Sequence, residues 1–183
     1  MKAKETKLEG CFVIEPNVFN DDRGYFFESF KQNELNEFLG YDVKFCQDNE
    51  SKSTYGVLRG LHFQKPPFEQ AKLVRCIKGK VLDVAVDLRI DSKTYGKHVT
   101  VELSEENKRQ LYVPRGFAHG FVVLSKEAIF AYKVDNTYAP IYDSGIAWDD
   151  KDLAIEWEIA ANEVKLSEKD QKLMSFSELD SPF

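Results

Sequence analysis

The chain has 183 residues, of which 43% are hydrophobic and 31% charged; these values are ordinary for a globular domain and exclude wholesale disorder. Its 31 acidic and 25 basic side chains give a net charge of −6, and the absence of any basic run argues against binding to nucleic acid. No stretch approaches the roughly 20 apolar residues that span a bilayer, so we expect no membrane association.

The N-terminal part of the chain holds the clearest helical pattern. Residues 1–10 contain no apolar run, so we expect no signal peptide here. Apolar side chains at i, i+3 and i+4 then predict a helix over residues 33–39. Asn33 is the expected N-cap of this helix, and Gly40 is the expected C-terminal stop.

Residues 47–64 form the densest group of polar and charged side chains. Strict strand alternation would point Arg59 and His62 to opposite faces of a sheet. Gly60 lies between them, and a β-bulge at this glycine would bring the two side chains together. We therefore expect a bulge that gathers Arg59 and His62 on one face.

Alternating strands dominate the middle of the chain, over residues 73–77, 81–89 and 98–103. The turn residues 78–80 predict a hairpin between the first two strands. The second strand has one apolar face and one charged face, formed by Leu82, Val84, Val86 and Leu88 and by Asp83, Asp87 and Arg89.

Two further strands are predicted over residues 121–124 and 129–134, joined by a hairpin turn at residues 125–127. They follow the pattern P-x-G-x-x-H at residues 114–119, which presents His119 at the start of a strand and resembles an element of the cupin jelly roll. Many short strands separated by frequent turns indicate an all-β fold. We expect a cupin-type jelly-roll β-barrel or sandwich with a few short helices.

The C-terminal residues 165–183 are expected to form a short helical tail of a single domain that spans residues 1–183. Ser167 and Asp170 have the spacing of a capping box that opens a short helix. No repeat, low-complexity tract or linker divides the chain, which favours one compact unit.

Neither the cysteines nor the histidines have the spacing of a disulfide framework or a metal site. Cys11, Cys46 and Cys76 form no CxxC pair and are expected as small buried hydrophobes, which suits an intracellular protein. Metal-binding cupins take further ligands from an H-x-H element, but the sequence at residues 62–64 is HFQ. We therefore expect a barrel without a bound metal.

Seven motifs occur in an order that is more specific than any one motif. They are RGYFFE at residues 23–28, QDN at 47–49, GVLRGLH at 56–62, KLVR at 72–75, DVAVDLR at 83–89, RQLYVP at 109–114 and GFAHGF at 116–121. Together they resemble the dTDP-4-dehydrorhamnose 3,5-epimerase family over residues 11–170. The resemblance implies a cupin-like epimerase domain that inverts C3 and C5 of a nucleotide-linked 4-keto-6-deoxy sugar through an enolate, without a cofactor.

The resemblance also implies a catalytic set of four residues. His62 is the implied base, with Asp170 as the carboxylate that orients it. Tyr132 is the implied acid on the opposite face of the sugar, and Lys72 is the cation that stabilises the enolate oxygen.

Each assignment has a structural alternative that the residues alone leave open. His62 and Tyr132 can be buried side chains whose polar atoms find hydrogen-bond partners. Lys72 can be a solvated strand residue, and Asp170 can serve only the capping box.

The resemblance assigns further polar and aromatic residues to the nucleotide sugar. Arg23 and Arg59 are implied for the diphosphate, which arginine binds with paired hydrogen bonds. Tyr138 is implied to stack on the base. The other implied contacts are Glu28, Gln47, Asp48, Asn49, His119, Phe19, Phe26, Asp143 and Lys169. Asp83 is expected either to pair with His119 or to lie on an outer sheet face.

Three other functions stay open. Departures from the family pattern at residues 92–95, 98 and 155–158 allow a divergent member that acts on another nucleotide sugar. The closest alternative is a relative that inverts only C3 or only C5, or that acts on a GDP-linked 4-keto sugar such as a heptose. A second possibility is a cupin module that binds a nucleotide sugar without turnover, although the base, acid and lysine all coexist here. The third, a metal-dependent dioxygenase, lacks its expected ligands.

The expected partners are a nucleotide-sugar substrate and a second copy of the chain. The resemblance implies a homodimer, in which the N-terminal strands would complete the partner's sheet and protect an exposed edge. The expected location is the cytoplasm.

Overall fold

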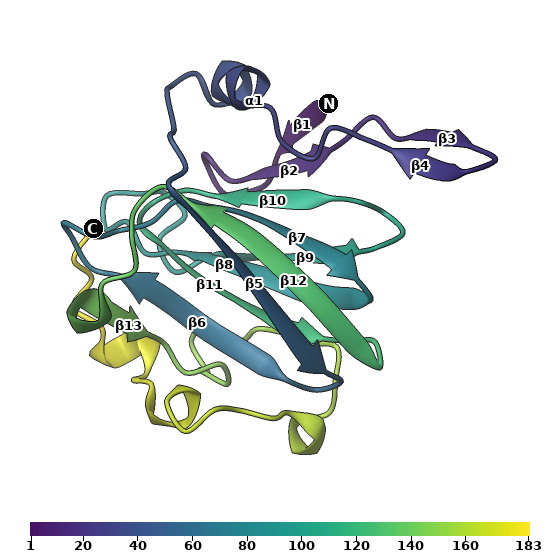
Figure 1. The fold of residues 1–183 in the computed structure, drawn as a ribbon. Helices are drawn as coiled ribbons and strands as arrows, with labels where there is room; N and C mark the ends of the chain where they lie inside the picture. The colour runs from purple at the N-terminus through teal and green to yellow at the C-terminus, as the bar shows by residue number, and fades with distance from the viewer.

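The computed structural model describes residues 1–183 as two antiparallel sheets that pack face to face (Figure 1). The six-stranded sheet consists, in spatial order, of β1 (Lys2–Glu5), β2 (Phe12–Glu15), β10 (Gln110–Val113), β7 (Lys72–Lys78), β12 (Glu127–Val134) and β5 (Gln47–Thr54). The five-stranded sheet consists of β13 (Asp143–Gly145), β6 (Leu58–Gln64), β11 (Phe117–Val123), β8 (Lys80–Asp87) and β9 (His98–Ser104). The predicted all-β sandwich is confirmed.

The remaining elements lie outside the two sheets. The strands β3 (Phe19–Asp21) and β4 (Gly24–Phe26) pair as a hairpin that projects from the body, here called the arm (Figure 1). One α-helix, α1 (Gln32–Leu39), is followed later by the 3₁₀ turns η1 (Pro140–Tyr142), η2 (Ala161–Glu163), η3 (Asp170–Lys172) and η4 (Phe176–Glu178). No helix is both long enough and apolar enough to cross a bilayer.

The helix α1 and its C-terminal stop are confirmed, but its predicted N-cap is wrong. Gly40 has a positive φ of 74°, and its N–H bonds the Asn36 carbonyl oxygen at 2.9 Å. Lys31 occupies the N-cap position and makes no side-chain cap. Asn33 lies inside the first turn because Gln32, whose amide bonds the Val43 carbonyl oxygen, already belongs to the helix.

All five predicted strands of the middle region are present, but both predicted hairpins are wrong, because their turns cross from one sheet to the other. β7 pairs with β10 and β12, whereas β8 pairs with β9 and β11. Gly79 makes the first crossing with a φ of 76°, and a Cβ there would clash with the Glu127 carbonyl oxygen of the second crossing. Ser125 accepts a hydrogen bond from the Lys80 N–H at 2.8 Å. The two crossings therefore pack together and hold the sheets in one sandwich.

The two faces of β8 divide as predicted, but the charged face points inward. Leu82, Val84 and Val86 pack against the C-terminal segment outside the sandwich. Asp83 and Asp87, on the other face, are completely buried. The possibility that Asp83 lies on an outer sheet face is therefore wrong. The interior between the sheets receives ionisable groups, which suits a site.

The C-terminal residues and the cysteines each differ in part from expectation. The predicted helical tail consists of the two short turns η3 and η4 with irregular backbone between them.

Cys11 and Cys76 are buried as expected, but Cys46 is exposed because it lies just before the edge strand β5. All three thiols are free.

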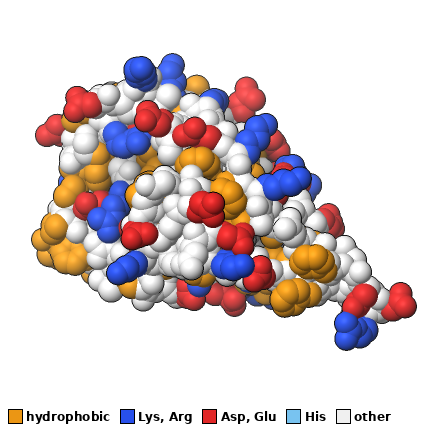
Figure 2. All heavy atoms as spheres, turned by 90° about the horizontal axis from the view of Figure 1, so that it is seen from above, with side chains coloured by type: hydrophobic (Ala, Val, Ile, Leu, Met, Phe, Trp, Pro, Cys, Tyr) orange, Lys and Arg blue, Asp and Glu red, His pale blue; other side chains and the backbone are white.

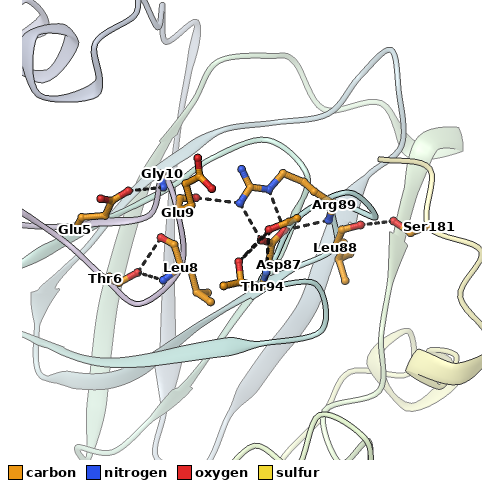
Figure 3. Close-up of polar contacts among 11 residues, drawn as sticks. Glu5, Thr6, Leu8, Glu9, Gly10, Asp87, Leu88, Arg89, Thr94 and Ser181 are labelled. Carbon is orange, nitrogen blue, oxygen red and sulfur yellow. Dashed lines mark hydrogen bonds and ion pairs between the residues drawn. The ribbon is translucent and has the colours of Figure 1, made fainter.

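A buried carboxylate at the end of β8 ties distant segments together (Figure 3). Asp87 accepts hydrogen bonds from the guanidinium of Arg89 at 2.9 and 2.8 Å and from the hydroxyls of Ser92 and Thr94 at 2.6 Å. Arg89 also donates to the Glu9 carbonyl oxygen at 3.0 Å, which anchors the N-terminal loop. Burial raises the pKa of Asp87, but these hydrogen bonds outweigh burial and hold its pKa below the ordinary value.

We expect Asp87→Asn to lower the free energy of unfolding by about 3 kcal/mol, because the substitution leaves the Arg89 charge without its buried partner. Urea unfolding at neutral pH measures the loss. The pKa of Asp87 is lowered in the folded state, so its contribution is present above the ordinary aspartate pKa and is lost as pH falls through the folded pKa. Asp21→Asn, at the exposed pair with Arg23, is the control and should leave the urea midpoint unchanged. Equal midpoints for both variants would contradict the prediction.

Candidate active site

A cavity of about 310 Å³ opens between the two sheets. Its walls come from β5, β6, β7, β11, β12 and the C-terminal segment. The lining residues are Glu50, Ser51, Arg59, His62, Lys72, His119, Phe121, Phe130, Tyr132, Ser167, Lys169 and Asp170. All four residues of the implied catalytic set are among them, so the fold brings together side chains up to 108 positions apart in sequence.

A β-bulge in β6 sets the orientation of two of these side chains. His62 pairs with His119 and Arg59 with Phe121, so β6 holds one more residue than β11 between the two pairs. Gly60 makes the bulge with a φ of 120°, and a Cβ there would lie 2.7 Å from the His119 carbonyl oxygen. Arg59 and His62 both line the cavity, which confirms the predicted bulge.

His62 is held by a carboxylate from the C-terminal segment. Its Nε2 lies 2.5 Å from Oδ1 of Asp170, which is only 5% exposed. Burial raises the pKa of Asp170, but the bond with His62 and a further bond from Ser167 hold its pKa below the ordinary value. Because Nε2 faces a carboxylate, the neutral imidazole carries its proton there and leaves Nδ1 free to accept one.

Lys72 is a buried cation without an ion-pair partner. It begins β7 and is 8% exposed, and its Nζ lies 3.5 Å from the His62 carbonyl oxygen. Burial lowers the pKa of Lys72 to about 8, against the weaker attraction of Asp83 and Asp143. A poorly solvated ammonium in a cavity interacts strongly with any negative charge that forms nearby.

His119 and Asp83 form a second imidazole–carboxylate pair, as expected. The Nε2 of His119 lies 3.0 Å from both oxygens of Asp83. Burial lowers the pKa of His119, and the attraction of Asp83 only partly offsets this effect. At neutral pH the imidazole is therefore uncharged and donates from Nε2 to the carboxylate.

Tyr132 lines the cavity from β12, whereas His62 lines it from β6 in the other sheet (Figure 1). Burial raises the pKa of Tyr132, with Arg59 acting in the opposite sense, so the phenol stays protonated at neutral pH. The Arg59 Nε donates to the Ser53 hydroxyl at 3.1 Å, which holds the guanidinium beside the cavity. A proton acceptor and a proton donor thus come from opposite walls.

Five of the implied substrate contacts form one hydrogen-bonded chain that leads to the cavity. Gln47 donates to the Asn49 side chain at 2.8 Å and accepts from the Tyr138 N–H at 3.3 Å. The Tyr138 hydroxyl donates to Asp143 at 2.9 Å, and Asp143 also pairs with Lys169. Because Lys169 lines the cavity, the chain reaches its rim.

Arg59 and His119 line the cavity, but the implied contacts on the arm and just after it do not reach it within the chain. Phe19, Arg23 and Phe26 lie on the arm, and Glu28 follows it. The Arg23 side chain is 90% exposed and bonds only the neighbouring Asp21. None of these residues lines the cavity.

Asp48 is separated from its neighbours by strand alternation. Gln47 and Asn49 face one side of β5, whereas Asp48 is exposed on the other side and pairs with Lys133 at 2.8 Å. Asp48 is not among the residues that line the cavity that holds His62.

Five residues of the cavity wall were not predicted as site residues: Glu50, Ser51, Phe121, Phe130 and Ser167. Ser51 shares a face of β5 with Asn49, so strand alternation was a usable signal for it. Ser167 was identified only as part of a capping box, yet it lines the cavity and bonds Asp170. Neither in this cavity nor elsewhere in the structure do three His, Cys, Asp or Glu side chains gather in a way that would hold a metal ion.

Both the sequence and the fold of this chain match those of known proteins. Residues 5–178 match the family model described as dTDP-4-dehydrorhamnose 3,5-epimerase. The chain is 51% identical over 179 residues to the enzyme of that name from Escherichia coli (strain K12), with 98% of this chain and 96% of that one covered. A structure of the enzyme of the same name from Elizabethkingia anophelis NUHP1 superimposes with a TM-score of 0.93 at 54% identity, covering 97% of each chain. A Legionella pneumophila dTDP-6-deoxy-D-glucose-3,5-epimerase in complex with dTDP-4-keto-L-rhamnose gives 0.94 at 45% identity, covering 98% and 94%.

Proposed function

The chain belongs to the dTDP-4-dehydrorhamnose 3,5-epimerase family and is an isomerase, and we propose that it inverts both C3 and C5 of a dTDP-linked 4-keto-6-deoxy sugar. The observation that carries the proposal is the placement of His62 and Tyr132 on opposite walls of one cavity. Inversion of a carbon requires removal of a proton from one face and delivery to the other, which two opposed groups supply.

His62 acts as the general base in this proposal. C3 and C5 flank the C4 ketone, so their protons are acidic enough for an imidazole to remove. Asp170 holds Nε2 and stabilises the imidazolium that forms, while Nδ1 accepts the proton. Tyr132 then donates its phenolic proton from the opposite face of the enolate. The His62 imidazolium releases its proton to solvent and the phenolate beside Arg59 recovers one from solvent, which restores both groups.

Lys72 stabilises the enolate. Removal of a proton next to the ketone moves negative charge onto O4, and a fixed cation in a poorly solvated cavity stabilises this charge more than the neutral ketone. The residues of the cavity thus cover proton removal, charge stabilisation and proton return, so the proposed reaction needs no cofactor. The same coexistence of base, acid and cation favours turnover over binding alone.

Incubation with dTDP-4-keto-6-deoxyglucose in deuterated water, followed by NMR of the sugar, tests the proposed function. We expect deuterium at both C3 and C5. Exchange at one carbon only would replace the proposal with a single-centre epimerase. No exchange with this sugar, but exchange with a GDP-linked 4-keto sugar, would change the substrate. No exchange with either would favour the binding module.

We further infer that the single domain works as a homodimer in which the arm of one copy reaches the site of the other. Phe19 and Phe26 pair across the arm and are 63% and 67% exposed, and Figure 2 shows hydrophobic side chains along the projection behind its charged tip. Exposed aromatic side chains of this size favour burial against a partner. β1 also forms a free edge of its sheet, which supports pairing between copies.

The three free thiols support a cytoplasmic location.

Mixing two inactive variants tests the arm in the dimer. His62→Asn destroys the base but keeps the arm, whereas Arg23→Ala with Phe26→Ala damages the arm but keeps the base. We expect the re-formed mixture to recover up to about a quarter of wild-type activity, since half of the dimers would hold one complete site out of two. A monomer by analytical ultracentrifugation, or a mixture as inactive as its components, would contradict the inference.

A further inference from the structure

The carboxylate of Asp170 is held from two sides. Its Oδ1 accepts the 2.5 Å hydrogen bond from the His62 Nε2, and its Oδ2 accepts one from the Ser167 hydroxyl at 2.8 Å. The same serine oxygen accepts the Asp170 backbone N–H at 3.1 Å. Because each oxygen of the carboxylate is bonded on a different side, the carboxylate is hindered from rotating about its Cβ–Cγ bond.

Asp170 depends on such contacts because it lies outside both sheets. Its segment is attached to the body at Lys165, whose N–H bonds the Gly56 carbonyl oxygen at 2.8 Å, and at Met174, whose carbonyl oxygen accepts the Ala147 N–H at 2.8 Å. Between these attachments the backbone forms only a short 3₁₀ turn, Asp170–Lys172. Ser167 organises this turn, since its carbonyl oxygen also accepts the Gln171 N–H at 3.1 Å.

We propose that Ser167 is a positioning residue, which fixes the Asp170 carboxylate so that His62 keeps its proton on Nε2 and offers Nδ1 to the substrate. The inference rests on the proposed function of His62 as the base. The Ser167 hydroxyl has one proton and gives it to Asp170, so it has none to donate to a sugar although it lines the cavity. Its effect on the reaction therefore passes through Asp170 and His62.

Only half of the predicted capping box forms, since the Ser167 hydroxyl accepts the Asp170 N–H but the Asp170 side chain does not return to the Ser167 N–H. A capping box would send the Asp170 side chain back to the Ser167 backbone N–H. Instead, Ser167 bonds the Asp170 N–H and side chain, and the second carboxylate oxygen points to His62. Ser167 therefore bonds only one oxygen of the Asp170 carboxylate, and the other oxygen is free to bond the His62 imidazole.

The test compares Ser167→Ala with Ser167→Thr and with a matched control. Ser175 caps η4 in the same segment by the same kind of bond, to Glu178 at 2.9 Å, but does not line the cavity. We expect Ser167→Ala to lower kcat at least tenfold with KM within about twofold, while Ser167→Thr regains most of the loss and Ser175→Ala keeps wild-type kcat.

The ¹⁵N NMR spectrum of the substrate-free protein supplies the readout that a purely structural role would not move. The chain has three histidines, so a His62→Asn sample identifies the signals of residue 62. We expect the Nε2–H tautomer in the wild type and in Ser167→Thr, and a mixture of tautomers in Ser167→Ala. An unchanged tautomer in Ser167→Ala, or an equal loss of kcat in Ser175→Ala, would overturn the proposal. The tautomer is measured without turnover, so it tests the role of Ser167 separately. The deuterium experiment tests the proposed function.

Discussion

His62→Asn is expected to lower kcat by about 10³-fold and to abolish deuterium incorporation at both C3 and C5, because one base removes both protons in the proposed reaction. Asn is similar in size and can still hydrogen-bond Asp170, so the variant should fold. The measurement is single-turnover NMR in deuterated water, with circular dichroism to verify the fold.

The pattern of loss at the two carbons is the discriminating feature of this experiment. Asp170→Asn is the companion variant, and it should reduce exchange at both carbons in the same proportion because Asp170 acts through His62. Exchange that persists at C5 in His62→Asn would assign that proton to a second base. His119 would then be the first group to test, since its imidazole lines the same cavity and is neutral at neutral pH.

Lys72→Met is expected to have two opposite effects, a loss of kcat of about 10²- to 10³-fold and a gain in stability. The enolate loses its cation, whereas the bound ketone loses little, so kcat should fall more than KM rises. The stability gain arises because burial lowers the pKa of Lys72 to about 8 from 10.5, a difference that corresponds to about 3 kcal/mol when the folded protein holds the charge at neutral pH.

The sign of the stability effect depends on pH in a testable way. Below pH 8 both the folded and the unfolded chain carry the Lys72 charge, so the full cost of burying it is present. Between pH 8 and 10.5 the unfolded chain binds more protons, so this cost decreases as pH rises. Urea unfolding of Lys72→Met against the wild type should therefore show an advantage that is largest below pH 8 and disappears near pH 10.5.

Activity has its own pH dependence if the ammonium form is required. In the wild type, kcat/KM should decrease above about pH 8, where Lys72 loses its proton. Lys72→Arg is the control, because arginine keeps its charge and should abolish this alkaline decrease even at a lower overall rate. Equal changes in kcat and in substrate binding in Lys72→Met would contradict the enolate role.

Local patterns in the sequence predicted strands well and their connections poorly. The alternation of residues 81–89 identified β8 and separated its two faces, because the strand period is a local property. The turns at 78–80 and 125–127 have ordinary turn composition, and nothing local states whether the next strand pairs with the last one or crosses to the other sheet. That choice depends on which strands lie alongside, which is decided by the packing of the whole chain.

The candidate site shows the same division. Composition and strand alternation were sufficient to predict the fold class, and the order of seven motifs was sufficient to identify the family, because these signals lie in residues close together in sequence. The catalytic set was predicted only through the resemblance to that family. Only the tertiary structure decided that the charged face of β8 points inward, that Asp170 both joins a turn and holds His62, and that the arm lies away from the cavity of its own chain. Burial, and with it the low pKa of Lys72, arises from segments far apart in sequence that together exclude water.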